Sequence, residues 1–427
     1  MARLSAAAAG ARFDGVLDRL ARRDVRLLGR PRSAFHACGW LGLLAAGAVV
    51  ALAGAAHHLP AWALLAMLAT GVAMFLSLAA AVRWATGQER LIYYHHEIAV
   101  LAAVALLLGL ARQPVARGLD VAALGLGAFL ACGRIGCLSA GCCHGRPARW
   151  GIRYGPEHAE LGLPSCLMGV RLVPIQLVES LLVAGAVATG LAVVLAGGQP
   201  GEAASLYVVA YAALRFVLEF LRGDPDRRYL AGFSEAQWTG VVILLGTAGV
   251  ELSGVLPVVW WHMAAALGLL AAAAAIAGVR RARDGQHDLL HARHLVAIAN
   301  TLARAPEPGD GVSVARTSLG LCISGGAVAS AGRSVHHYSL SRAGQPLRPR
   351  EARALARVIV ALRHRWDAWT LTPGRSGVFH VVVACEPGLL ARSGRPHCAS
   401  TRAPADNSLP SSPGHRRGVA TGKLYRR

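Results

Sequence analysis

The sequence predicts an all-α polytopic membrane protein of about 7–8 transmembrane helices with a small C-terminal soluble α/β region. The chain has 427 residues, of which 54% are hydrophobic and only 16% charged. Soluble proteins carry about 25% charged residues. Several apolar segments reach the ~20 residues that a helix needs to cross a bilayer. After residue 279 the composition changes, and the rest of the chain is no longer membrane-like.

Four parts follow from this composition. Residues 1–38 form a basic amphipathic N-terminal segment suited to a membrane interface, and residues 39–279 form the membrane domain. Residues 280–385 form the small soluble region, and 386–427 form a Pro-, Ser- and Arg-rich tail that we expect to be disordered. The expected spans are 39–56, 61–82, 96–110, 119–138, 176–196, 204–221, 237–253 and 258–278. In the soluble region we expect strands over 312–330 and 377–385 and a helix over 349–364.

The net charge of +21 comes almost entirely from arginine. In a membrane protein, arginines hold the topology and contact anionic lipid headgroups, so membrane and lipid partners are favoured over nucleic acid. With eight spans, the N-terminal arginines, the loops at 83–95, 139–175 and 222–236 and the C-terminal part lie on one side. The positive-inside rule makes that side cytoplasmic.

Charged residues recur at helical spacing in the sixth span. Tyr211, Arg215 and Glu219 follow one another every four residues, and Arg222 comes three residues later. We therefore expect all four on one helical face. Charges in an apolar helix normally face a polar interior and pair with another group. The alternative is a purely structural Arg215–Glu219 pair that locks two helices together.

The end of the fourth span is rich in glycine. The segment GRIGCLSAGCCHGRP at 133–147 contains five Gly and Pro residues, which predicts a broken helix with exposed backbone N–H groups beside Arg134 and Arg146. Guanidinium groups and a Gly-rich backbone together favour an anion or phosphate site. The alternative is a membrane-edge turn with topogenic charges.

Polar residues also stand at the starts of the third and fifth spans. His95 and His96 start the third span, where a neutral imidazole can serve as a general base or a metal ligand, although interface histidines are common. PIQLVE at 174–179 places Gln176 and a carboxylate at the start of the fifth span.

Five of the nine cysteines fall between Cys132 and Cys166. Cys137, Cys142 and Cys143, with His144, offer an alternative metal or thiol redox site, although the spacing differs from the paired CxxC of ordinary zinc sites. Buried cysteine is also a common small hydrophobe.

In this order, the motifs resemble the prolipoprotein diacylglyceryl transferase family over most of residues 39–255. GRIGCLSAGCCHGR at 133–146 stands in place of the family signature GRIGNFINGELWGR, and PIQLVE stands in place of PSQLYE. YAALRFVLEFLRGDPD at 211–226 keeps the family's Tyr, Arg and Glu spacing. The resemblance implies seven spans, with the signature side facing outward. The positive-inside rule instead places that side in the cytoplasm, so two orientations stay open.

The resemblance implies a multi-pass protein of the bacterial plasma (inner) membrane that acts in lipoprotein biosynthesis. Such a transferase moves a diacylglyceryl group from phosphatidylglycerol to the thiol of a lipobox cysteine in a prolipoprotein, without a cofactor. The implied catalytic residues are His95 or His96, Arg134, Arg215 and Glu219. The implied substrate-binding residues are Tyr211, Gly145, Arg146, Gln176 and Arg222. Cys137, Ala140 and Cys142 replace asparagines and a glutamate of the signature. A membrane metal or thiol redox protein and a non-catalytic lipid-binding paralogue are the alternatives.

Overall fold

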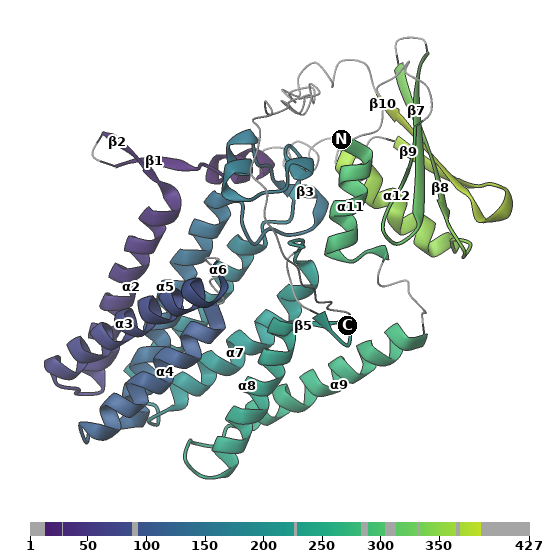
Figure 1. Cartoon of the computed structure of the whole chain (residues 1–427). Helices are drawn as coiled ribbons and strands as arrows, with labels where there is room; N and C mark the ends of the chain where they lie inside the picture. The colour runs from purple at the N-terminus through teal and green to yellow at the C-terminus, as the bar shows by residue number, and fades with distance from the viewer. Residues whose placement is uncertain are drawn as a thin grey trace, which may run out of the picture.

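A computed structural model of the chain forms a helical bundle with an α/β region at one end (Figure 1). The structure describes residues 13–27, 29–87, 93–225, 229–282, 289–303, 313–330, 333–363 and 368–385. The predicted fold class is confirmed, since seven helices are long and apolar enough to cross a membrane and the sheet lies in the C-terminal part. The expected tail at 386–427 lies outside the described residues.

The helices agree with the expected spans to within a few residues at most ends. They are α2 (Ala34–Ala56), α3 (Ala61–Thr86), α4 (Tyr93–Leu110), α5 (Val115–Ala140), α6 (Ile175–Leu195), α7 (Glu202–Leu218), α8 (Glu235–Leu252) and α9 (Trp260–Ala282). The seven apolar spans include every one of these except α8, whose first turn carries Glu235 and Gln237 and whose last turn carries Glu251. α8 nevertheless packs between α7 and α9 in the bundle.

The predicted break in the fourth span is wrong. α5 continues through Gly133 and Gly136 and ends at Ala140, where Gly141 adopts the left-handed conformation with φ 73°. The helix persists at Gly136 because a close neighbour uses the space of its missing side chain. An added Cβ there would lie 3.2 to 3.3 Å from Cys38 and Phe35 of α2. Gly136 therefore serves helix packing, and because both glycines lie within the helix, neither forms an anion-binding loop.

The bundle presents apolar side chains outward, as a lipid-facing surface requires. Leu44, Leu65 and Leu267 are each more than 60% exposed, and so are the interfacial tryptophans Trp84 and Trp260. Tryptophan near helix ends is typical of the boundary between lipid and water.

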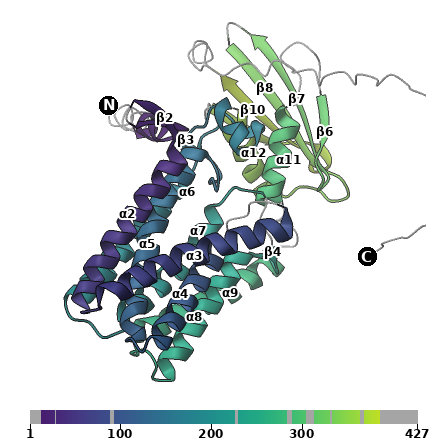
Figure 2. The ribbon, with the colours of Figure 1, turned by 60° about the vertical axis from the view of Figure 1, so that its left-hand side comes forward.

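The C-terminal region is a five-stranded antiparallel sheet with helices packed against it (Figure 2). Its strands are β6 (Ser313–Arg316), β7 (Leu321–Ser330), β8 (Arg333–Arg342), β9 (Ala368–Pro373) and β10 (Phe379–Cys385), in the order β6-β7-β8-β10-β9. The helices are α11 (Ala292–Ala303) and α12 (Pro349–Arg363). The expected helix at 349–364 and strand at 377–385 are present, whereas the expected strand at 312–330 turns at 317–320 and divides into β6 and β7. The sequence reasoning missed α11, β8 and β9.

The connection between α5 and α6 is folded against this region. It contains β3 (Pro147–Ile152) and two short 3-10 helices, η1 (Pro156–Leu161) and η2 (Ser165–Leu167). α11 packs on η2 and α12 packs on β3. One hydrophobic core joins Leu167 of the connection, Ile298 of α11 and Val381 of β10.

The N-terminal segment lies at the same end of the bundle. Residues 13–20 form a helix, followed by a hairpin of β1 (Asp24–Leu27) and β2 (Arg30–Ser33) that leads into α2. Leu17 belongs to the core that contains the C-terminal sheet, and Arg171 of the connection pairs with Asp18 at 2.7 Å. Because both terminal parts are at one end, the chain passes along the bundle an even number of times, and α8 is one of these passages.

Candidate active site

The candidate active site is a cluster of buried arginines around Glu179 of α6. Arg134 of α5 lies 3.0 Å from Oε1 of Glu179. Arg215 of α7 lies 3.6 Å from Oε2, and Arg222 lies 3.9 Å from the same oxygen. Glu179 and Arg222 are each 1% exposed, so these charges interact out of water. Glu179 therefore shares its charge with three guanidinium groups from three different chain segments.

This arrangement leaves donors available. Nε of Arg134, Nη1 of Arg215 and Nη1 of Arg222 are buried, and each lacks a hydrogen-bond acceptor within the described ranges of the chain. Buried guanidinium N–H groups without acceptors are costly unless an anion meets them. The cluster can therefore bind a phosphate group in a preorganised fork of donors.

The predicted pair on the sixth span is present, since Nη2 of Arg215 lies 3.2 Å from Oε2 of Glu219. Tyr211, one turn earlier, donates a long hydrogen bond of 3.5 Å to Glu179. The α-helix ends at Leu218, a 3-10 turn follows at 219–221, and Arg222 is extended with ψ 141°. The expectation that Arg222 shares the helical face is therefore wrong, although its guanidinium still reaches Glu179.

Two glycines allow the two loops beside the cluster to meet. Gly145 and Arg222 form an antiparallel bridge, and Gly223 donates its N–H to the carbonyl of His144 at 2.9 Å. A Cβ on Gly145 would lie 2.4 Å from the carbonyl oxygen of Val173. A Cβ on Gly223 would lie 2.4 Å from the carbonyl oxygen of Gly145. Only glycine fits at these positions, so the predicted role of Gly145 near the site has a steric basis.

The remaining predicted substrate-binding residues line the same loops. Arg146 donates from Nε to the carbonyl of Arg222 at 3.2 Å, and Arg222 also pairs with Asp224 at 2.8 Å. Gln176 donates to the carbonyl of Cys142 at 2.7 Å, which fixes the turn after α5. Burial lowers the pKa of Arg146 below its usual value.

α4 contributes its own face to the interior. Tyr93 lies edge-on to Tyr211 with a centroid distance of 6.5 Å, and Tyr207 stacks on Tyr211 at 6.0 Å. The carboxyl of Glu97, which is buried on α4, lies close to Tyr207. A stack of tyrosines thus leads from the arginine cluster toward the buried Glu97.

The two predicted histidines point to other parts of the molecule. His96 is buried, and its ring packs on Phe75 of α3 at 4.6 Å. His95 is 48% exposed and lies 3.6 Å from Glu235 of α8. Neither of these contacts is with the arginines or with Glu179.

The cysteines form a second cluster beside the first. The sulfur atoms of Cys137, Cys142 and Cys143 all lie within 4.8 Å of one another. Hydrogen bonds from the neighbouring thiols, followed by the positive charges of Arg222 and Arg134, hold the pKa of Cys143 below its usual value. Burial lowers the pKa of His144 and favours its neutral form.

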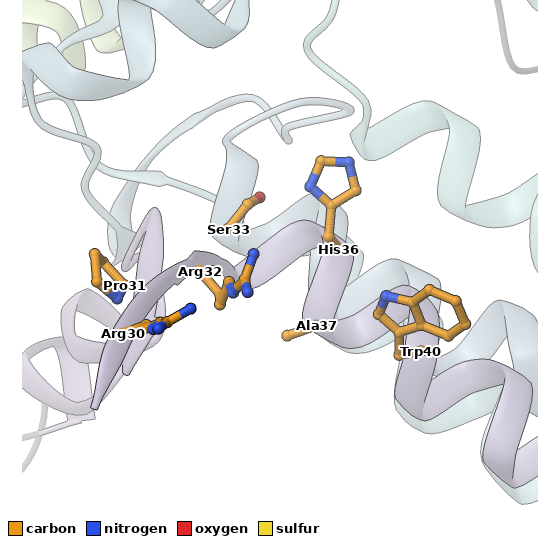
Figure 3. A pocket seen from close by; sticks show the side chains of 7 residues that line it. All are labelled: Arg30, Pro31, Arg32, Ser33, His36, Ala37 and Trp40. Carbon is orange, nitrogen blue, oxygen red and sulfur yellow. The ribbon is translucent and has the colours of Figure 1, made fainter. Parts of the chain in front are cut away.

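A hollow on the surface lies where β2 joins α2. It is lined by Arg30, Pro31, Arg32, Ser33, His36, Ala37 and Trp40. Figure 3 shows the two arginines on the strand beside His36 and Trp40 from the first turns of the helix. Trp40 is 69% exposed. Basic side chains next to an exposed tryptophan are typical of a surface at the lipid headgroup level.

Glu179 and Glu97 are the residues that the sequence reasoning did not select for the site. Glu179 stands in PIQLVE, so the motif contained the signal, but a single carboxylate at a span entrance does not reveal that three arginines converge on it. Glu97 follows His96 directly, and the helical turn places it on the tyrosine side.

The fold and this site define a class: a multi-span membrane protein with a buried cationic cluster at one end of its helix bundle. Residues 92–253, which run from α4 through α8, match the family model for prolipoprotein diacylglyceryl transferase. This region of the chain is therefore similar to the prolipoprotein diacylglyceryl transferase family.

Curated relatives agree with this match. The chain is 35% identical over 133 residues to phosphatidylglycerol-prolipoprotein diacylglyceryl transferase 2 of Clostridium perfringens, an overlap of 30% of this chain and 48% of that protein. It is 31% identical over 126 residues to the corresponding transferase of Dehalococcoides mccartyi, covering 30% of this chain and 46% of the relative. A relative from Clostridium tetani is 34% identical over 93 residues, or 36% of its length. The chain therefore matches about half of these relatives or less.

Proposed function

We propose that this protein is a transferase of the bacterial inner membrane that moves a diacylglyceryl group from phosphatidylglycerol to the thiol of a lipobox cysteine in prolipoproteins. The observation that carries the proposal is the convergence of Arg134, Arg215 and Arg222 on one buried carboxylate with guanidinium N–H groups left over. The names of the curated relatives support the same donor and acceptor.

The reaction needs a site of this kind. The acceptor sulfur forms a bond to the terminal glyceryl carbon while the bond from that carbon to the phosphate oxygen breaks. The electron pair stays with the departing glycerol phosphate, so negative charge grows on the phosphate in the transition state. Preorganised donors in a water-poor site stabilise such charge, at about 3 to 4 kcal/mol for each donor.

The contacts support a role for each of these residues. Arg134 and Arg215 bind the phosphate, and Arg222 closes the site from the loop. Glu219 orients Arg215, and Tyr211 positions the headgroup beside Glu179. Glu179 keeps the three positive charges together, so that a phosphate meets them without a large rearrangement.

The acceptor thiol must lose its proton, because the thiolate is the nucleophile. We propose that His95 or His96 accepts this proton as a general base, as the family resemblance implies. Rates of His95→Gln and His96→Gln variants distinguish the two, and a full rate in both variants would remove the role from the proposal.

The basic hollow at β2 and α2 is assigned to anionic headgroups of the surrounding lipid. A variant with Arg30→Gln and Arg32→Gln is expected to need more phosphatidylglycerol in mixed micelles for half-maximal rate, with the maximal rate kept. An unchanged lipid requirement would argue against this assignment.

The test is incubation of the purified protein in phosphatidylglycerol-containing micelles with a lipobox peptide. Peptide mass and released glycerol phosphate are followed together. We expect a diacylglyceryl mass gain in the wild type and a rate lower by about 100- to 1,000-fold in Arg134→Ala and Arg215→Ala. Lysine at either position keeps the charge but loses the fork of donors, so a partial loss is expected there.

Arg149→Ala is the matched control, since Arg149 is an exposed arginine of the same connection. Full activity in Arg134→Ala or Arg215→Ala would contradict the phosphate role. Bound lipid without any transfer by the wild type would overturn the proposal in favour of a non-catalytic lipid-binding paralogue.

A further inference from the structure

Three thiols converge at the end of α5. Cys137 lies in the last turn of the helix, and Cys142 and Cys143 lie in the turn that follows it. Their sulfur atoms are all within 4.8 Å of one another, and all three are free thiols that are partly buried. The proposed transfer reaction uses none of them.

The backbone of this turn is fixed in a conformation that brings the thiols together. Gly141 and Cys143 both have positive φ, 73° and 56°, and the latter is unusual for a residue other than glycine. Gln176 holds the carbonyl of Cys142, and Gly223 holds the carbonyl of His144. Contacts from α6 and from the loop after α7 thus maintain the turn.

This spacing is close to that of a metal–thiolate site. Three sulfur atoms bound to one ion at about 2.3 Å are about 3.8 to 4.0 Å apart. Sulfur atoms within 4.8 Å of one another need to approach by about 1 Å or less to reach this separation. We propose that Cys137, Cys142 and Cys143 bind one thiophilic metal ion, zinc(II), as thiolates.

His144 lies in the same turn, but its ring nitrogens are not among the ligand atoms that lie within 4.8 Å of one another. Its Nδ1 lies 3.0 Å from the carbonyl oxygen of Gly145, and a carbonyl can only accept, so Nδ1 carries the proton. Nε2 therefore holds the lone pair, and this buried atom has no hydrogen-bond partner in the described part of the chain. This tautomer is usual for a metal-binding histidine, but the position of the ring leaves the three sulfur atoms as the ligands of the proposed site.

The surrounding charges suit a zinc–thiolate complex. Three thiolates and one zinc(II) ion have a net charge of about −1. The guanidinium groups of Arg222 and Arg134 act electrostatically on Cys143. They stabilise an anionic complex, whereas a metal site made of neutral ligands alone would be repelled by them. The inference does not depend on the transferase activity.

The test is the metal content of the full-length protein, purified in detergent under reducing conditions and measured by elemental mass spectrometry. We expect about one zinc ion for each chain, retained through dialysis, and a loss to background in Cys142→Ser and Cys143→Ser. Cys132→Ser is the matched control, because Cys132 lies on the same helix outside the three-thiol group. It is expected to keep the zinc.

Cobalt(II) loading gives a second readout. A thiolate-to-cobalt charge-transfer absorption is expected in the wild type and in Cys132→Ser, and its loss in the two other variants. The zinc content and the cobalt absorption of the wild type test the proposal even if a variant fails to fold. A wild type that contains no zinc as purified and shows no cobalt charge-transfer absorption after loading would overturn the proposal. A disulfide between cluster cysteines in the purified protein would overturn it as well. Equal zinc in the cluster variants would mean an adventitious ion only.

Discussion

Glu179 contributes the negative charge that Arg134, Arg215 and Arg222 share in the interior of the bundle. Its neighbours on the sequence give little sign of this, since the first turn of α6 is otherwise apolar or amide. A buried carboxylate that holds several cations is destabilising to remove, because the cations then remain uncompensated.

Replacing Glu179 by glutamine is therefore expected to reduce both stability and transfer rate. The expected destabilisation is about 3 to 5 kcal/mol, as for loss of one partner of a buried ion pair. The expected rate is lower by about 100-fold or more, because the arginines lose their shared orientation. Thermal unfolding in detergent and the peptide transfer assay measure the two effects.

Glu160→Gln is the control for this variant. Glu160 is 71% exposed and pairs with Arg23 at the surface, so its loss is expected to change neither quantity appreciably. A Glu179→Gln protein with wild-type melting temperature and rate would contradict the role given to Glu179.

At the scale of elements, glycines decide how closely α5 approaches its neighbours. An added Cβ on Gly127 would lie 2.5 Å from side-chain atoms of both Val187 on α6 and Tyr207 on α7. By contrast, a Cβ on Gly133, less than two turns further along α5, would meet nothing within 4 Å. Both positions are helical, so helix propensity acts equally on them.

Gly127→Ala is expected to lower the free energy of unfolding by about 1 to 3 kcal/mol through overpacking. Gly133→Ala is expected to leave it unchanged or raise it by up to about 1 kcal/mol, because alanine favours the helix. Melting temperatures of the two variants, measured side by side, check this. Equal destabilisation would show that the packing at Gly127 is not the cause.

The same packing explains why the elements were more predictable than the site. Apolar length locates a span, and the expected segments match α2 through α9 closely. The glycines in the fourth span predicted a break, but α2 packs closely on Gly136 and α5 stays continuous through both Gly133 and Gly136. The Arg215–Glu219 pair was predictable because it lies within one helix, four residues apart.

For the whole molecule, the C-terminal region is joined to the site through the connection between α5 and α6. Its core includes Leu167, Ile298 and Val381, and α11 and α12 pack on η2 and β3. The connection also leads into Gln176 and Glu179 on α6. The placement of the site thus depends on a part of the chain outside the region that matches the family model.

Ile298→Asp is expected to release this contact, because Ile298 is fully buried and an isolated charge there is costly. Amide hydrogen exchange over 147–172 should become faster, while the membrane helices keep their protection. Val314→Asp on β6 is the control, since Val314 is 70% exposed. Unchanged protection of 147–172 in Ile298→Asp would contradict the docking of the two parts.

The even number of passages also bears on orientation. Arg146, Arg171 and Arg280 lie at the end of the bundle that carries both terminal parts, and Arg112 and Arg117 lie at the other end. The positive-inside rule predicts that the arginine-rich end is cytoplasmic, and this stays a prediction.

The sequence by itself determined the class of protein, the spans and the identity of Arg134, Arg215 and Glu219 as the charged residues of interest. These are local properties, because insertion into lipid depends on apolar length and a helix places residues four apart on one face. Only the tertiary structure decided that Glu179 joins three arginines, that Arg222 reaches it from outside the helix, and that three thiols meet beside them. The groups that neutralise a buried charge are brought together by the packing of helices that are distant in the sequence. The local spacing of residues does not predict that packing.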